Sequence, residues 1–367
     1  MQIPFFGLKR YYELNRENIL NTTNETYKTG QFLKGKEIEK FEKNIANYCR
    51  RKFAVTVSSC TDALYFSLIA AGIKRNDQVL VTSYSFISSA TSIIRAGAIP
   101  VFLDIEDRSF MMNPKEIENK ITKDTKAIIV VHLFGQTFPF DIINKIADKY
   151  RLIIIEDAAQ SLGARWKNQF SGSLGKISCL SFDPTKNIGA FGTGGCMITD
   201  DEKIFKQLLM LRNHGKSENG TYMQLGYNSQ IASIQAALLD MQLKEIENIN
   251  GQRKNIAGTY YEKLKNIAQI KLPVISDDNT PTFHKFVIIA NNRDDLRKYL
   301  KAAGIETMVH YPKILPQHDV FKPYEQDISK YPIALFCAKN SISIPLHPEL
   351  SETEIDYICD KIINFYQ

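Results

Sequence analysis

Short apolar runs, each about the length of one β-strand, alternate with helical patterns through the first two thirds of this chain. The runs are FAVTV (53–57), QVLVTS (78–83), AIPVFLD (98–104), AIIVVHLF (127–134), LIIIED (152–157), ISCLSF (177–182) and GCMIT (195–199). Amphipathic patterns such as DALYFSLIAAGI (62–73) and PFDIINKIADKY (139–150) lie between them. Strands that are apolar on both faces and separated by helices are typical of a mostly parallel sheet covered on both sides. In such α/β folds ligands bind at the carboxyl ends of the strands, so functional residues are expected there.

The pattern changes in the last third of the chain. Residues 213–229 indicate a loop, and one long helical pattern begins near Ser229 and continues toward Lys265. Beyond it, KFVIIA (285–290) and SISIPL (341–346) predict strands, and DDLRKYLKAAG (294–304) predicts a helix. We therefore expect a large domain over 1–245, opening with an arm at 1–30, and a smaller α+β domain over 246–367.

Composition excludes several classes of protein. Hydrophobic residues make up 44% and charged residues 23% of the 367, as in an ordinary globular protein. The net charge of +6 is spread along the chain, which argues against nucleic acid as a partner. The six cysteines form no C-x-x-C pair and have no histidine at metal spacing, so we expect reduced thiols and no metal. With neither a signal peptide nor a bilayer-spanning run visible, a cytoplasmic protein is expected.

Three of the predicted strands are followed by polar or aromatic residues that allow two interpretations each. Asp157 ends a buried strand, where a carboxylate either meets a cation or serves as a cap or salt-bridge partner. The segment SSCTD, with Cys60 and Thr61, suits an ordinary helix N-cap or a phosphate site at a helix N-terminus. In TSYSF (82–86), Phe86 suits either the core or a stack on a planar ligand.

A fourth strand end carries a lysine among glycines. Lys186 follows ISCLSF, with Ser181 just before it and glycines at 189, 192, 194 and 195 after it. Glycines permit close backbone approach, but the stretch matches neither the P-loop nor the dinucleotide fingerprint. Taken together, a phosphate cradle, a ring, a carboxylate and a lysine from four strand ends are the parts that pyridoxal phosphate requires. In that interpretation Lys186 acts as general base and acid.

Several linked motifs then resemble one family, the nucleotide-sugar aminotransferases of the DegT/StrS group, which are fold type I pyridoxal phosphate enzymes. The resemblance covers nearly the whole chain and is carried by TGQFLKGKEIEKFEKNIANYC, SSCTDAL, TSYSFISSATSIIRAGAIPVFLDIE, IEDAAQSLGA, SFDPTKNIGAFGTGG, LRNHG, LGYNSQIASIQAALL and VHYPKILPQH. It implies a large domain with a mostly parallel central sheet flanked by helices, plus a smaller α+β C-terminal domain.

The resemblance also assigns roles to residues of this chain. Lys186 would carry the cofactor as an internal aldimine, and Asp157 would pair with its pyridine nitrogen. Gln160 would contact the phenolic oxygen of the cofactor, Phe86 would stack on its ring, and Cys60, Thr61 and Ser181 would hold its phosphate. Asn228 would come from the partner subunit, and His310 and Tyr311 would lie near the sugar or its diphosphate. A related branch that performs dehydration has histidine in place of this lysine, so Lys186 favours transamination.

This chain departs from the family at two positions. Cys60 stands where glycine is common, which is tolerated if its backbone is not at positive φ. Gln230 stands where arginine often follows the asparagine of G-Y-N, so a charged fork that could grip a substrate is missing.

The implied reaction moves an amino group from L-glutamate to a keto carbon of a dTDP- or UDP-linked keto-6-deoxy sugar, with C3 slightly favoured over C4. The enzyme would be a homodimer with shared active sites, and its product would enter a surface glycan such as lipopolysaccharide O-antigen. Three alternatives stay open: a fold type I lyase or decarboxylase acting on an amino acid, a nicotinamide-dependent oxidoreductase and a non-catalytic regulator.

Overall fold

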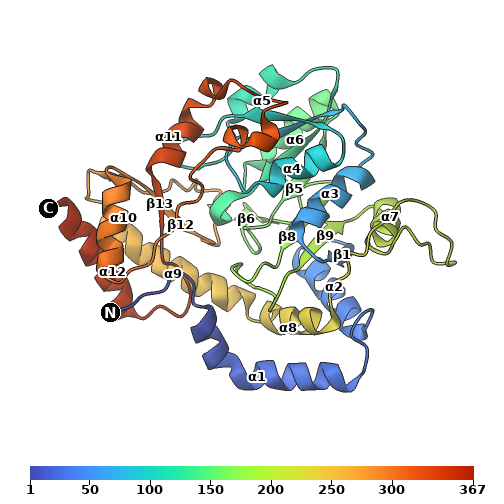
Figure 1. Ribbon diagram of the computed structural model, residues 1–367, viewed down its shortest axis with the longest axis horizontal. Coiled ribbons are helices and arrows are strands. Elements are labelled where there is room, and N and C mark those ends of the chain that lie inside the picture. The colour runs from blue at the N-terminus through green and yellow to red at the C-terminus, as the bar shows by residue number, and fades with distance from the viewer.

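The computed structural model describes residues 1–367 and is organised around a seven-stranded sheet of order β1-β9-β8-β5-β4-β2-β3 (Figure 1). The strands are β1 (Phe53–Val57), β2 (Gln78–Thr82), β3 (Ile99–Leu103), β4 (Thr125–Val131), β5 (Ile153–Asp157), β8 (Ile177–Ser181) and β9 (Gly195–Thr199). Only β9 runs antiparallel to its two neighbours, and the other pairs are parallel. The expected mostly parallel α/β sheet is confirmed.

Helices cover both faces of this sheet because the strand residues alternate between two cores. Val55 and Val57 of β1 join a core with α3 and α7, whereas Ala54 joins a second core with α2 and α8. The helices of this part are α1 (Leu8–Lys28), α2 (Lys36–Tyr48), α3 (Cys60–Ala70), α4 (Ser88–Arg95), α5 (Pro114–Lys120), α6 (Phe140–Tyr150), α7 (Glu202–Arg212) and α8 (Ser233–Leu243). The amphipathic interpretation of 62–73 was wrong, because α3 is buried along most of its length, polar Ser67 included.

The C-terminal part forms a separate three-stranded sheet of order β10-β12-β13 with its own core. Its elements are α9 (Ile246–Leu264), β10 (Ile270–Lys271), β12 (Phe286–Ala290), α10 (Arg293–Ala302), α11 (Pro332–Asn340), β13 (Ser341–Ile344) and α12 (Glu352–Tyr366). The core of the large sheet also takes in Ala334 and Cys337 of α11. The domain boundary after residue 245 stays a prediction.

The long helix predicted from Ser229 toward Lys265 is in fact two helices, which was not expected. Helix α8 ends at Leu243 and α9 begins at Ile246. Residues on both sides of the break pack in the core beside α2: Leu239, Leu243 and Ile246 are buried there, while Tyr260 farther along α9 is buried in the C-terminal core. A small third sheet of β11 (Asn279–Thr280), β6 (Arg165–Trp166) and β7 (Gln169–Phe170) was also not predicted, because two-residue strands carry no periodic signal.

The N-terminal segment docks on the C-terminal part before α1 begins. The Ile3 N–H donates to the Gly304 carbonyl at 2.8 Å, and the Glu306 N–H donates to the Ile3 carbonyl at 3.0 Å. Arg10 of α1 pairs with Glu354 of α12 at 2.7 Å. Figure 1 shows α1 running beneath α8, with both chain termini on the same side of the molecule. None of the helices combines the length and apolar character that crossing a bilayer requires.

Candidate active site

A cavity of about 510 Å³ lies where the carboxyl ends of β2, β4, β5 and β8 meet the first turn of α3 and the segment before β12. Nine of the ten residues singled out in the sequence line it: Cys60, Thr61, Phe86, Asp157, Gln160, Ser181, Lys186, His310 and Tyr311. The tenth, Asn228, does not line this cavity. Residues up to 251 positions apart in the sequence (60 to 311) are thus brought together at one edge of the sheet.

Asp157 presents a buried carboxylate to this cavity. Its residue is only 4% exposed, and its oxygens accept hydrogen bonds from Ser89 Oγ at 2.7 Å and from the Ala159 N–H at 3.3 Å. No ion pair satisfies it within the chain. Burial raises the pKa of Asp157 although Ser89 and Ala159 act against that rise. A cationic N–H in the cavity would compensate this carboxylate.

Lys186 lines the same cavity from the turn that follows β8. Its amine makes no salt bridge, and burial lowers its pKa below the ordinary value for lysine. A lowered pKa leaves more of the amine neutral at neutral pH, and a neutral amine is the form that acts as nucleophile and base. Lysine and aspartate therefore meet at one site without being paired to other residues.

The first turn of α3 forms the expected cradle. Ser59 caps the helix by accepting from the Asp62 N–H, so the N-cap interpretation of this segment is correct. The N–H groups of Cys60 and Thr61 nevertheless have no partner within the chain and remain available to an anion at the positive end of the helix. Cys60 has no positive φ, so its side chain is tolerated there. A Cβ on Gly195 would lie only 2.5 Å from the Cys60 nitrogen, so glycine is required beside the cradle.

Aromatic side chains form part of the cavity wall. Phe86 is 55% exposed, and its ring centroid lies 6.4 Å from that of Tyr311. The Tyr311 hydroxyl accepts from Gln160 Nε2 at 3.1 Å, while Gln160 Oε1 accepts from the Phe134 N–H at 3.0 Å. An exposed phenylalanine in a cavity is the arrangement expected of a ring that stacks on a ligand, not of a core residue.

Sequence reasoning missed the residues that position this wall. The Tyr84 hydroxyl donates to the His310 carbonyl and accepts from the Tyr311 N–H, both at 2.6 Å, so it fixes the His310–Tyr311 segment. His310 Nδ1 lies 2.8 Å from Ser343 Oγ, and burial lowers the His310 pKa to about 3, which keeps the imidazole neutral. Ser89, His284 and Lys285 were also missed. The only available signal was that Tyr84 and Ser89 lie in or next to the TSYSF stretch.

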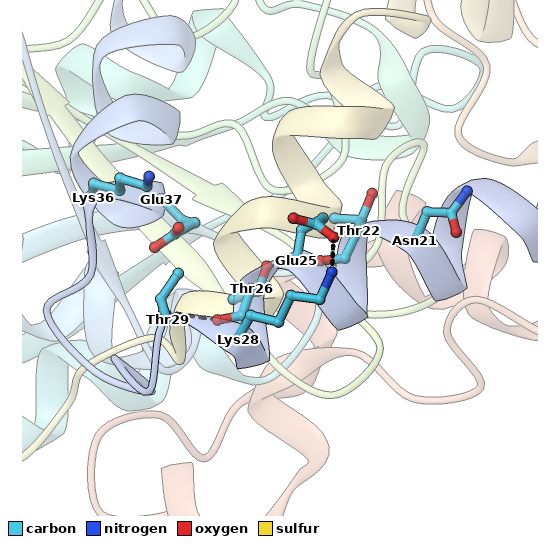
Figure 2. Close-up of a pocket in the computed structure, with 8 residues that line it drawn as sticks. All are labelled: Asn21, Thr22, Glu25, Thr26, Lys28, Thr29, Lys36 and Glu37. Carbon is cyan, nitrogen blue, oxygen red and sulfur yellow. Dashed lines mark hydrogen bonds and ion pairs between the residues drawn. The ribbon is translucent and has the colours of Figure 1, made fainter.

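A second hollow, of about 560 Å³, lies between the C-terminal half of α1 and the start of α2 (Figure 2). It is lined by Asn21, Thr22, Glu25, Thr26, Lys28, Thr29, Lys36 and Glu37. Some of its polar groups pair locally, with Lys28 Nζ 2.6 Å from Glu25 Oε1 and Thr29 Oγ1 2.7 Å from the Thr26 carbonyl. None of the residues predicted to be functional lies here, so the cavity around Lys186 is the candidate active site.

Comparison with known proteins agrees with this geometry. The model of the DegT/DnrJ/EryC1/StrS aminotransferase family matches residues 13–363. The chain belongs to this family. Streptomyces venezuelae dTDP-3-amino-3,4,6-trideoxy-alpha-D-glucose transaminase is 34% identical, over 98% of this chain and 95% of that protein. A protein named pleiotropic regulatory protein from Geobacillus stearothermophilus is 37% identical, over 100% of this chain and 99% of its own length.

Solved structures of aminotransferases have the same fold. DesV of S. venezuelae, solved in complex with a ketimine intermediate, superposes with a TM-score of 0.97 over 100% of this chain and 99% of that chain, at 33% identity. Other relatives at 32 to 35% identity are also named as aminotransferases of nucleotide-linked sugars. The chain is a pyridoxal phosphate-dependent sugar aminotransferase, as the sequence predicted.

The cavity fits pyridoxal phosphate on its own chemistry. The cofactor needs an amine to hold it, an acid for its ring nitrogen and donors for its phosphate. Lys186 is half-buried and Asp157 is buried, neither forms a salt bridge, and the free N–H groups of the α3 first turn lie in the same cavity. All three requirements of the cofactor are therefore met by groups that line one cavity.

Proposed function

We propose that the enzyme moves the amino group of L-glutamate to a keto carbon of a nucleotide-linked keto-6-deoxy sugar, with C3 favoured over C4. The observation that carries the proposal is the placement of Lys186 and Asp157 in one cavity, neither of them in a salt bridge, beside the free N–H groups of α3. An ordinary structural lysine or aspartate would be paired or solvated.

In this proposal each residue of the cavity has one task toward the cofactor. Lys186 would hold it through the amine, and Asp157 would pair with its pyridine nitrogen. The N–H groups of Cys60 and Thr61, with Ser181, would hold the phosphate, and Phe86 would stack on the ring. Gln160 would bind the phenolic oxygen. When bound, the cofactor supplies an electron sink for the charge left when the donor loses its α-proton.

In this proposal Lys186 transfers the proton that the donor loses. With its pKa lowered by burial, the Lys186 amine is a base able to take the proton from Cα of glutamate and, in the second half of the cycle, to take part in the proton transfers at the aminated sugar carbon. His310 and Tyr311, fixed by Tyr84, orient the sugar against the cofactor face. Asp157 stays ionised as long as a protonated ring nitrogen faces it.

The preference for C3 is supported by the relatives. Those named for a single sugar include a dTDP-3-amino-3,6-dideoxy-galactose transaminase of Aneurinibacillus thermoaerophilus and a UDP-N-acetyl-3-dehydro-glucosamine aminotransferase of Acidithiobacillus ferrooxidans, both 35% identical. Both names place the reaction at C3, while the nucleotide differs. We propose C3 for this chain and keep both dTDP and UDP.

We propose a homodimer with shared sites. Asn228 lies outside its own cavity, bridged to Asn213, in a loop that also exposes Tyr222 by 68% and Leu225 by 88%. Large exposed apolar side chains in one loop are typical of a contact surface. If the loop completes the partner's site, mixing Lys186→Ala and Asn228→Ala chains creates one intact site per mixed dimer and restores activity that neither variant has alone. Without sharing, no intact site exists in the mixture.

The cellular location is a further part of the proposal. All six cysteines are free, five of them buried, as suits a reducing compartment, so we propose a cytoplasmic enzyme. Its amino sugar would enter a surface glycan such as lipopolysaccharide O-antigen.

The first test is a product assay by NMR. Purified enzyme with pyridoxal phosphate and L-glutamate is offered 3-keto- and 4-keto-6-deoxyhexoses linked to dTDP, separately. Amination of the 3-keto sugar alone is the expected result, and amination of the 4-keto sugar alone would reverse the regiochemistry. If neither reacts, the UDP sugars follow. Failure there as well would leave the amino-acid lyase or decarboxylase as the leading function.

A further inference from the structure

A buried cation in the catalytic cavity has no use in the chemistry above. Lys285, in the segment just before β12, is 8% exposed and lines the same cavity as Lys186 and Asp157. It also lines a neighbouring cavity of about 530 Å³ that Lys186 borders from the other side. Its ammonium group makes neither a salt bridge nor a hydrogen bond with the chain. A buried lysine without a partner is costly unless something else compensates its charge.

The surroundings of Lys285 do not supply that compensation. Its ammonium lies over the rings of Phe6 and Phe5, at 4.2 and 5.2 Å from their centroids. Such cation–π contacts leave the N–H donors of the ammonium unused. Burial, Arg253 and Lys186 all lower the pKa of Lys285, and Asp183 is the acid that opposes them. Asp183 is itself exposed.

The basic groups near Lys285 do not offer a free charge to a ligand in the cavity. Arg253 is 6% exposed, donates only to backbone carbonyls and leaves its Nε without a partner. Burial keeps His284 and His310 neutral by lowering their pKa values. Apart from Lys186, Lys285 is therefore the amine that lines this cavity.

We propose that Lys285 binds a carboxylate of the substrate. This inference rests on the proposed function, because every amino acid that donates to a transaminase brings a carboxylate next to the reacting carbon. A sugar bearing a C6 carboxylate would bring the same group in the second half of the cycle. One relative, from Pseudomonas aeruginosa and 32% identical, is named for such a sugar, a 3-oxo-D-glucuronate linked to UDP.

The test compares wild-type holoenzyme with Lys285→Met, which keeps the apolar stem on Phe5 and Phe6, and Lys285→Arg, which keeps the charge. Lys361→Met is a matched control, because that lysine lies 5.2 Å from the Tyr357 ring centroid, away from the cavity. The cofactor absorption spectrum checks that each variant is folded and loaded. If the Met variant does not fold, Lys285→Gln replaces it.

The first measurement is the binding of glutarate, a dicarboxylate that cannot react, followed by calorimetry. The second is the single-turnover reaction with L-glutamate, which separates apparent affinity from maximal rate. We expect Lys285→Met to weaken both affinities by roughly 10- to 100-fold, the effect of one hydrogen bond to a charged group, with the maximal rate changed less than about threefold. Lys285→Arg should recover most of the affinity, and Lys361→Met should behave as wild type.

Keto sugars with and without a C6 carboxylate, offered to the aminated enzyme, identify the source of the carboxylate. If only the carboxylated sugar binds more weakly to Lys285→Met, the sugar and not the donor is the ligand, and Lys285 remains a carboxylate anchor. Unchanged affinity for all these ligands, or equal weakening that includes the neutral sugar, overturns the proposal. A failure of the proposed function is seen separately, because the glutarate and glutamate measurements do not require the correct sugar.

Discussion

Two consecutive acids at the end of β5 have opposite environments. Glu156 is fully buried and accepts hydrogen bonds from His132 Nε2 at 3.0 Å, from the Leu174 N–H at 3.0 Å and from several further donors of the 171–178 segment. Asp157, on the other face of the sheet, receives only the Ser89 and Ala159 bonds and faces the cavity. One carboxylate is saturated by the chain, and its neighbour is left for a ligand.

The pKa values of the two acids differ accordingly. Burial acts to raise the pKa of Glu156, but hydrogen bonds from His132, Gly172 and Ser178 outweigh it and lower the pKa to about 2. For Asp157 burial wins, and the pKa is raised. His132 Nδ1 accepts the Phe138 N–H, so Nε2 carries the proton that Glu156 receives. The number of internal donors therefore distinguishes a structural acid from a functional one.

The largest expected effect lies on the cavity side. Lys186→Ala should reduce turnover by roughly 10³-fold or more, because the chain loses both its attachment for the cofactor and its base. The Tm of the variant without cofactor should not fall, since the lysine forms no salt bridge in the chain. Steady-state assays and thermal unfolding measure both. More than about a tenth of wild-type turnover in this variant would contradict the assignment of the site.

Asp157→Asn tests whether Asp157 is the functional acid of the pair. We expect turnover to fall by roughly 10²- to 10³-fold, because an amide cannot stabilise a protonated ring nitrogen. The apoenzyme should become more stable, by about 1 kcal/mol, since a buried charge that lacks a partner is removed. Thermal unfolding of the apo form measures the second effect, and a loss of apo stability would contradict it.

Glu156→Gln should show the reverse pattern. The amide loses charge-assisted bonds and places its NH2 group against the donors of one former oxygen, either Gly172 or Leu174, so the free energy of unfolding should fall by about 3 kcal/mol. Turnover per folded, cofactor-loaded enzyme should stay within roughly tenfold of wild type, because Glu156 does not line the cavity. Denaturant unfolding measures the free energy of unfolding, and an activity assay normalised to bound cofactor measures the turnover. A folded but inactive variant would place Glu156 in the chemistry.

The pH dependence of stability gives a further test of the structural role of Glu156. The folded pKa of Glu156, about 2, lies below its ordinary 4.5, so its ionisation stabilises the fold above pH 4.5 and that contribution is lost as the pH falls toward 2. Wild type should therefore lose stability over this window more steeply than Glu156→Gln. Unfolding curves at steps from pH 5 to pH 3 compare the slopes. Parallel curves would mean that other carboxylates dominate the acid response.

The smallest effect is expected for a residue that holds Asp157. Ser89→Ala removes the 2.7 Å bond to Asp157 Oδ2 and should lower turnover by about five- to tenfold, equivalent to about 1 kcal/mol. Ser92→Ala is the control, because Ser92 is buried on the same helix and contacts only the Ser89 carbonyl. The ratio of the two kcat values is the measurement. Equal values for both variants would show that Ser89 does not position the acid.

The sequence predicted much of the cavity because its parts are local. A residue that directly follows a buried strand lies at the edge of the sheet whatever the rest of the chain does, and this placed Asp157 and Ser181 correctly. Helix breaks were not predictable in this way. Both α8 and α9 have the helical period, and the break at Lys244 and Glu245 was not predicted from it.

What the sequence determined by itself is the layered sheet, the helix cap at Ser59, and the lysine and acid at the strand ends, because hydrophobic period and turn composition are properties of neighbouring residues. Only the tertiary structure decided that Glu156 is saturated while Asp157 is free, and that Lys285 is buried without a partner in the catalytic cavity. Those outcomes depend on donors and charges from segments far apart in the chain. No local pattern records which polar groups folding leaves without a partner.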